Sequence, residues 1–345
     1  MRRNVANFGG DPARVTLAGE SGGAQGICAQ LTSPGATGLF DRVIIQSNPC
    51  VRPGLDQSPF PPLINLPVWL SPAEADDNAM ALARETGCAD AGTTPDAIVR
   101  CLRGLPVAAL LGDALLNAGF LTLPSYGNRV LPEIPDQVLL SGRFHRVPVL
   151  EGITRDEGTF FAALLSPAPI PDDGYRPILE TTFGDRAAAV EDRYPLSAYR
   201  SARHALAAIV SDREWAWTAE ESDDLFARHV PTYSYEFTDR RATPLFPYPD
   251  DLPAGASHGA ELGYLFDRLG RPNDLDQAQR ALANRMIRYW ARFARSADPN
   301  RPGLPRWPQY RPDAATPHVQ ELGPGRTGHF DRSGEHQLPF WKELG

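Results

Sequence analysis

The first fifty residues alternate between short apolar runs and a polar, glycine-containing segment. Residues 14–18 read RVTLA and end at Gly19, which predicts a β-strand. Residues 22 to about 31 can form a helix that stops at the sequence TSPG, and residues 43–47 form a second apolar β-run. Strand, helix and strand in this order predict two parallel strands joined by a crossover helix.

Two more strands are predicted further along the chain. Residues 146–150 read RVPVL and are closed by Gly152, and residues 232–237 read TYSYEF with clear alternation. Pro148 suits a strand position that needs no ladder donor. The region beyond Pro302 is rich in proline and glycine, so we expect it to be coil on the surface.

The helical patterns lie between these strands. A capping box predicts a helix from Ser71 to about residue 84, with Pro72 at its first position. Further helices are expected over 94–103, 211–227 and 274–295, listed by their approximate ends. We interpret residues 1–345 as one α/β domain, a mostly parallel sheet flanked by helices, with cap-like helical insertions around 68–120 and 165–228 and a proline-rich loop over 53–67.

Composition narrows the class of function. The chain has 345 residues, 42% of them apolar, and a formal net charge of −8, which argues against a nucleic-acid surface. No run of 18 apolar residues is present, so no membrane span is expected. The four cysteines form no CxxC pair, so neither a metal site nor a cofactor is implied.

The cysteines allow two interpretations. Cys88 and Cys101 bracket a short loop, and either form a disulfide or are two unpaired thiols. Cys28 falls in a predicted buried helix, where we expect it to be a small apolar residue.

The sequence GESGG at residues 19–23 is a GxSxG motif between a predicted strand and a predicted helix. In that setting a serine adopts a strained backbone conformation, which lifts its hydroxyl above the sheet. Gly19 and Gly23 remove Cβ atoms that would collide as strand and helix pass. The N–H of Gly22 can donate to a developing oxyanion, so we predict Ser21 as a nucleophile.

A serine nucleophile needs a base, and the base needs an anion to hold its tautomer. His258 lies in a loop of small residues after the strand at 232–237, which favours it over the other histidines. Asp156 and Glu157 follow the strand at 146–150. The alternative for Glu157 is a solvated loop carboxylate, the commonest fate of a glutamate.

The motifs together resemble the type-B carboxylesterase, or cholinesterase-like, family over nearly the whole chain and in the family's order. The matching residues are 4–12, 15–17, 19–21, 39–42, 46–47, Cys88, 101–103, 156–158, 258–259, Glu261, 289–290, 298–300 and Trp307. The resemblance implies an α/β-hydrolase fold.

By the same resemblance the triad acid is Glu157, with Asp156 as the alternative. Glu20 matches an acidic residue near the base and water, or simply a helix-start carboxylate. Ser47 matches a serine that hydrogen-bonds near the acid, or a strand-end hydroxyl. Cys88 and Cys101 match a family disulfide, which favours a secreted over a cytoplasmic location.

Two departures from the family qualify this interpretation. The family carries a segment upstream of residues 4–12 that supplies the first strands and an HGGG-like oxyanion loop, and no HGG occurs here. Gly22 stands where the family usually has alanine, and it is the one oxyanion donor we can identify. We therefore expect a fragment without N-terminal strands, with an exposed edge at residues 14–18, needing that segment in cis or as a separate chain.

The expected function is hydrolysis of a small carboxylic ester through an acyl-enzyme, with Ser21, His258 and Glu157 as the triad. The alternatives are a weak or inactive fragment and a non-catalytic binding protein of the same family.

Overall fold

A six-stranded sheet forms the centre of the molecule, with its strands side by side in chain order. The computed structural model describes residues 2–345 apart from 52–68, 91, 112–122, 167 and 268–272. The first five strands are parallel, and the last pairs antiparallel with the fifth. The strands are β1 (Thr16–Glu20), β2 (Arg42–Gln46), β3 (Val149–Thr154), β4 (Thr232–Phe237), β5 (Val319–Gly323) and β6 (Arg326–Phe330). The mostly parallel α/β sheet is confirmed, and each of the four predicted strands overlaps an observed one.

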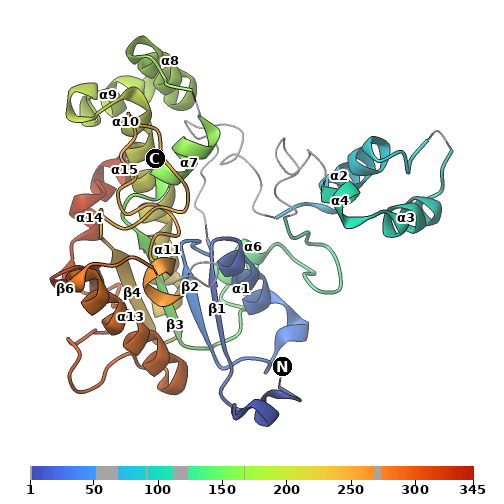
Figure 1. Cartoon of the computed structure of the whole chain (residues 1–345), viewed down its shortest axis with the longest axis horizontal. Helices are drawn as coiled ribbons and strands as arrows, with labels where there is room; N and C mark the ends of the chain where they lie inside the picture. Colours follow the sequence, from blue (N-terminus) through green and yellow to red (C-terminus); the bar gives the residue numbers. More distant parts are fainter. Residues whose placement is uncertain (1, 52–68, 91, 112–122, 167, 268–272) are drawn as a thin grey trace.

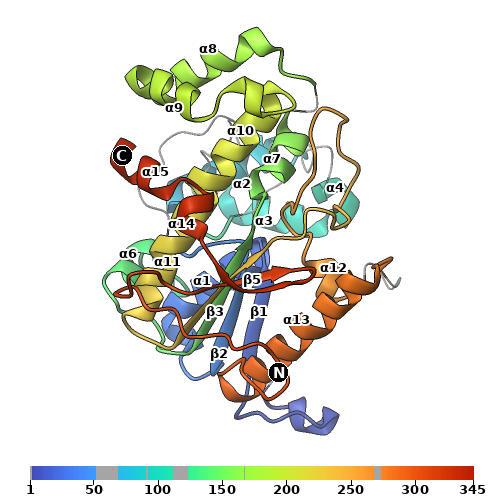
Figure 2. The same ribbon diagram turned by 90° about the vertical axis from the view of Figure 1, so that its left-hand side faces the viewer.

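Helices cover both faces of the sheet (Figure 2), and β2 shows why. Val43 and Ile45 pack in a core with α1 (Gly22–Thr32), α6 (Pro135–Leu140) and α11 (Trp217–Ala227). Ile44 points the other way, into a core with α13 (Gln277–Ser296). Because alternate residues of a strand face opposite sides, a continuous apolar run is what a doubly covered parallel strand requires.

The remaining helices lie beyond the carboxyl ends of the strands or apart from the sheet. Figure 1 shows α2 and α3 apart from the sheet, on the right. Ser71 and Glu74 form the predicted capping box of α2. These helices are α2 (Pro72–Glu85), α3 (Pro95–Gly104), α4 (Val107–Leu111), α7 (Glu157–Leu165), α8 (Asp172–Phe183), α9 (Ala187–Arg193), α10 (Ala202–Val210), α12 (Leu262–Leu265), α14 (Arg332–Glu335) and α15 (Leu338–Leu344). The expected cap-like insertions at 68–120 and 165–228 remain an interpretation, and the expected loop at 53–67 lies outside the described residues.

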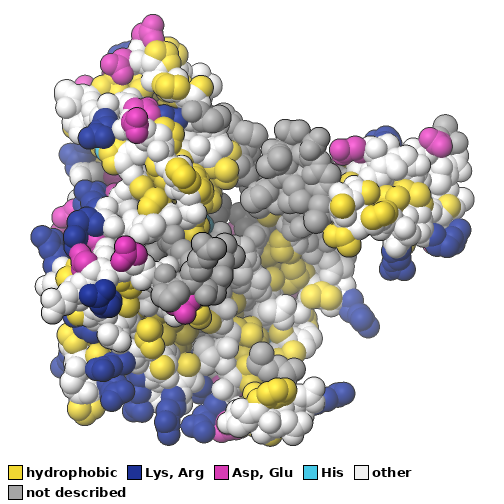
Figure 3. All heavy atoms as spheres, viewed as in Figure 1, with side chains coloured by type: hydrophobic (Ala, Val, Ile, Leu, Met, Phe, Trp, Pro, Cys, Tyr) yellow, Lys and Arg dark blue, Asp and Glu magenta, His cyan; other side chains and the backbone are white. Residues whose placement is uncertain are grey.

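The surface and the helix lengths add two observations. Acidic and basic side chains are interspersed on the face of the molecule that Figure 3 shows. None of the helices in the described ranges combines the length and the apolar character needed to cross a bilayer.

The expectation of coil beyond Pro302 is wrong. Strands β5 and β6 form a hairpin in this region, and two short helices, α14 and α15, follow it. The strands have five residues each and carry polar side chains such as Gln320, so their apolar pattern is weak. Leu322 is buried between β4 and α13, and Val319 packs with Tyr310 and Phe330 beside the end of α11.

Two disulfides are present, one expected and one not. Cys88 and Cys101 are joined, with their Cα atoms 5.6 Å apart, as the family resemblance implied. Cys28 is buried in α1, as expected, but it is bonded to Cys50 and is not an isolated small apolar residue. The pairing was missed because the two cysteines meet only after β2 has docked beside β1.

Buried charges tie the C-terminal segment to the sheet. Arg332 of α14 contacts Asp223 of α11 at 2.7 Å and Glu236 of β4 at 3.1 Å. The ring of His336 lies between Asp212 and Glu236, at 2.6 Å from each. Burial lowers the pKa of His336, but the two carboxylates outweigh burial and raise it to about 10. The imidazolium is therefore the form that the folded chain stabilises.

This pKa predicts how stability depends on pH. The pKa of His336 is raised from 6.5 to about 10, so its contribution is complete below pH 6.5 and is lost as the pH rises towards 10. Urea unfolding at several pH values should show that the free energy of unfolding of the wild type falls by about 3 kcal/mol or more across this window. His336→Gln should make this slope shallower, and His258, whose pKa is raised to about 9, should account for part of the slope that remains, whereas His229→Gln, at an exposed ring, should keep the full slope. An unchanged slope in His336→Gln would contradict the assignment.

Candidate active site

Ser21 occupies a tight turn between β1 and α1. Its backbone has φ 55° and ψ −119°, a conformation that non-glycine residues rarely adopt. Its N–H donates to the carbonyl of Gln46 at 2.9 Å, which fixes the turn against β2. A Cβ on Gly19 would lie 2.5 Å from the backbone of Gly23, so Gly19 is needed for this crossing. We also predicted that Gly23 must lack a Cβ for strand and helix to pass. This prediction is wrong, because a Cβ on Gly23 would meet nothing within 4 Å.

Glu157 and His258 form the central pair of the site. Glu157 begins α7 just beyond β3, and His258 lies in the long loop after β4. Oε2 of Glu157 lies 2.6 Å from Nδ1 of His258, and Oε1 accepts from the N–H of Thr154 at 2.8 Å. Both side chains are buried. The geometry is that of a carboxylate that holds one tautomer of an imidazole.

Asp156, the alternative acid, makes different contacts. Its carboxylate accepts from Arg240 at 2.7 Å and 3.0 Å and from the N–H of Ala256 at 2.8 Å. Its partners are therefore Arg240 and the backbone of the loop that carries His258, whereas Glu157 contacts the ring itself.

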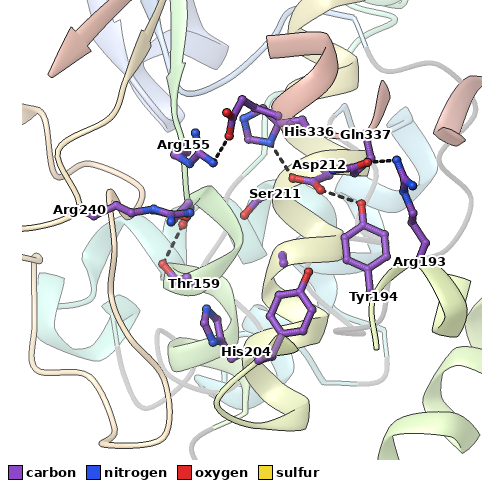
Figure 4. Close-up of a pocket in the computed structure, with 14 residues that line it drawn as sticks. Arg155, Thr159, Arg193, Tyr194, His204, Ser211, Asp212, Arg240, His336 and Gln337 are labelled. Carbon is purple, nitrogen blue, oxygen red and sulfur yellow. Dashed lines mark hydrogen bonds and ion pairs between the residues drawn. The ribbon is translucent and has the colours of Figure 1, made fainter. Parts of the chain in front are cut away.

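A polar cavity of about 190 Å³ lies beside this loop (Figure 4). Asp156, Thr159, Asp212 and His336 are among its lining residues, whereas Ser21 and His258 are not. The hydroxyl of Thr159 donates to the carbonyls of Asp156 and Ala254, both at 2.7 Å. These contacts hold the start of α7 against the loop that carries His258.

Three carboxylates raise the pKa of His258, and Glu157 and Glu20 contribute most. Burial lowers the pKa of His258, but the charge and hydrogen bond of Glu157 outweigh burial and raise it to about 9, with Glu20 adding to the effect. Glu20 Oε1 lies 3.3 Å from Nε2, on the other ring nitrogen from Glu157. Burial raises the pKa of Glu20 to about 7. The ring is therefore held between two acidic side chains, as the resemblance implied for Glu20.

Among the described contacts, Ser21 is connected to His258 only through the residue before it, Glu20. Within the described ranges, no hydrogen bond connects the hydroxyl of Ser21 to the ring of His258, and the acidic oxygen of Glu20 is the group near Nε2. Catalytic hydrogen bonds are often long in free enzymes and tighten only with substrate bound. The described contacts therefore place Glu20, the residue before Ser21, beside the ring of His258.

Ser47 has a strained backbone but does not make the contact that the family resemblance implied. Its φ is 49°, it is fully buried, and its N–H donates to Gly152 of β3 at 2.8 Å. In the described part of the chain its hydroxyl has no hydrogen-bond partner. The hydroxyl contact near the acid, one of the two interpretations of Ser47, is therefore not made among the described residues.

Sequence reasoning gave no role to several residues that surround the histidine. Phe160, Phe161 and Trp215 each place a ring centroid 5.1 Å from that of His258. The two phenylalanines are three and four residues after Glu157 in α7, so helical spacing alone places them on its face. Trp215 lies in a π-helix, Ser211–Ala216, which no simple pattern predicts.

Glu261 is a third buried acid in the site, known from the sequence only as a matching position. It accepts from Gln46 Nε2 at 3.0 Å, and Gln46 in turn accepts from Trp290 Nε1 at 2.9 Å. Burial and the nearby charge of Glu20 raise the pKa of Glu261 to about 8. Although the site is rich in carboxylates, no group of three or more potential ligands among the described residues could hold a metal ion.

Comparison with known proteins places this geometry in context. The family model described as "Carboxylesterase family" matches residues 1–341. Similar proteins include cocaine esterase of Oryctolagus cuniculus, 28% identical over 90% of this chain and 57% of the relative, and acylcarnitine hydrolase of Mus musculus, 28% identical over 89% and 54%. Liver carboxylesterase of Sus scrofa is 27% identical over 100% of this chain and 62% of its own length. The chain thus spans between 54% and 62% of the length of these relatives.

The Glu157–His258 pair makes a direct prediction. Glu157→Gln removes the charge that raises the pKa of His258, so this pKa should fall from about 9 towards or below 6.5. NMR titration of the labelled histidine ring measures it. Asp156→Asn, one residue away and without contact to the ring, should leave the value near that of the wild type. Equal falls in both variants would show that the pKa reports a general change in the loop.

Proposed function

Because this chain belongs to the carboxylesterase family, we propose that it hydrolyses small carboxylic esters through an acyl-enzyme formed on Ser21. The observation that carries the proposal is the buried 2.6 Å contact between Glu157 and His258, in one site with a serine in a strained strand-to-helix turn. Strained backbone conformations of this kind cluster at functional sites.

Each residue has a defined step in the reaction. His258 Nε2 accepts the proton of the Ser21 hydroxyl as the serine oxygen attacks the ester carbonyl. Glu157 holds Nδ1–H and stabilises the imidazolium that forms. The N–H of Gly22, in the first turn of α1, donates to the oxyanion. The alcohol leaves with the proton from His258, and water then releases the carboxylic acid by the same steps in reverse.

The charge state of His258 defines when these steps can occur. With its pKa raised to about 9, the ring is largely protonated at neutral pH and cannot then act as a base. The absence, in the described part of the chain, of a hydrogen bond between the Ser21 hydroxyl and the ring of His258 favours a second candidate, a family member that binds esters but turns them over slowly. The two candidates differ in their rate of reaction at Ser21, which a covalent probe measures.

Replacing the nucleophile tests the proposal. Ser21→Ala should lower kcat for p-nitrophenyl butyrate by about 10⁴- to 10⁶-fold and abolish labelling by a fluorophosphonate. Ser197→Ala, at an exposed serine, serves as the control and should behave as the wild type. Turnover that survives in Ser21→Ala would refute the assignment, and a wild type that is never labelled would favour the binding protein.

The carboxylate of Glu20 gives a separate prediction on pH dependence. Activity should rise with pH as His258 loses its proton, and Glu20 raises the pKa of this histidine. In Glu20→Gln the rising limb of kcat/KM against pH should therefore move to lower pH, by roughly one unit. Glu133→Gln, which breaks an exposed ion pair with Arg143, is the control. If the rising limb of kcat/KM against pH does not move in Glu20→Gln, Glu20 does not influence the pKa of His258.

A further inference from the structure

The Cys28–Cys50 disulfide lies close to the turn that carries Ser21. Cys28 is in the second turn of α1, the helix that begins directly after Ser21, and Cys50 lies four residues beyond the end of β2. Both cysteines are buried, at 1% and 3% exposure. The bond therefore links the nucleophile helix to the segment that leaves the neighbouring strand.

A second contact closes a ring around the turn. The N–H of Ser21 donates to the carbonyl of Gln46, the last residue of β2, at 2.9 Å. From Gln46 the buried segment 47–51 leads to Cys50, and the disulfide returns to Cys28 on α1. A hydrogen bond on one side and a covalent bond on the other thus hold the turn between them.

The segment that carries Cys50 is itself anchored. The N–H of Cys50 donates to the hydroxyl of Ser222 on α11 at 3.3 Å, and Ser222 donates to Glu151 of β3 at 3.0 Å. The N–H of Ser47 donates to Gly152 of β3 at 2.8 Å. The disulfide therefore fastens α1 to a segment that is already fixed on the sheet.

The composition of α1 explains why such a fastening is needed. Its first five residues are GGAQG, so Gly22, Gly23 and Gly26 fall in the turns that must point at the reacting carbonyl. Glycine stabilises a helix less than alanine does, because it loses more backbone freedom on folding. The strained φ of Ser21 adds a cost that persists only where the surroundings over-determine it. Cys28 follows the last of these glycines by two residues, where a covalent anchor restrains the weak part of the helix.

We infer that Cys28 and Cys50 are positioning residues for the reaction: their disulfide holds the glycine-rich start of α1 so that the Ser21 hydroxyl and the Gly22 N–H keep their places. The inference rests on the proposed function of Ser21. It assigns to this disulfide a role that the Cys88–Cys101 bond does not share, because Cys88 and Cys101 join the α2 and α3 region, apart from the sheet (Figure 1).

The two disulfides provide a matched comparison. Cys28→Ala/Cys50→Ala and Cys88→Ala/Cys101→Ala are each compared with the wild type, well below the Tm of every variant. The first pair should lower kcat for p-nitrophenyl butyrate, and the rate of fluorophosphonate labelling, by about tenfold or more, with KM changed little. The second pair should lower Tm but retain both rates. Wild-type rates in a folded Cys28→Ala/Cys50→Ala variant would overturn the inference.

A rescue variant separates positioning from general loss of stability. A Cβ on Gly26 would meet nothing within 4 Å, so Gly26→Ala strengthens the helix without a clash. Added to Cys28→Ala/Cys50→Ala, it should recover a substantial part of kcat and of the labelling rate. Recovery of Tm without recovery of either rate would contradict the positioning role.

A second variant and the labelling of the wild type distinguish failure of the positioning role from failure to fold and from failure of the proposed function. If the alanine pair does not fold, Cys28→Val/Cys50→Ala fills the vacated space, and the same comparison of rates applies. If the wild type is not labelled at Ser21, the proposed function fails. If the wild type is labelled and the disulfide variant is labelled equally fast, only the positioning role fails.

Discussion

The parallel pairing of β1 to β4 is the constraint on which the site depends. Because parallel strands end at the same edge of a sheet, the residues that follow each strand are delivered to one side. Ser21 follows β1, Ser47 follows β2, Glu157 begins the helix after β3, and His258 lies in the loop after β4. A one-residue slip in any of these registers would turn buried side chains to the opposite face. The sheet therefore positions the chemistry, and the loops only select which side chains reach it.

The balance of charge around His258 is the second organising feature. One imidazole lies between Glu157 and Glu20, and a third acid, Glu261, is buried nearby. Burying several carboxylates is costly, and the chain offsets this by raising the pKa of Glu20 and of Glu261 towards neutrality. Because these groups lie close together, a change in the charge of one alters the pKa values of the others. The site is better understood as a coupled set of acids around one base than as three independent residues.

Long-range links compensate for local weakness elsewhere in the fold. The helix after Ser21 is rich in glycine, and a disulfide ties it to the segment beyond β2. The C-terminal strands and helices have a weak apolar pattern, and buried ion pairs from Arg332 and His336 tie them to α11, β4 and the π-helix. In both places the stabilising contact joins segments that are distant in the chain.

The sequence by itself determined the local elements of structure. The strand, the GxSxG turn, the following helix and the capping box of α2 are all set by residues within a few positions of one another, and each was predicted. The tertiary structure decided what depends on the direction of a side chain or on distant partners. It joined Glu157 rather than Asp156 to His258, placed Glu20 at the second ring nitrogen, and turned the Ser47 hydroxyl away from any bond to the described residues. It also paired Cys28 with Cys50 and made strands of the C-terminal segment. The physical reason is the same in each case: these contacts form only when strands far apart in the sequence have packed side by side.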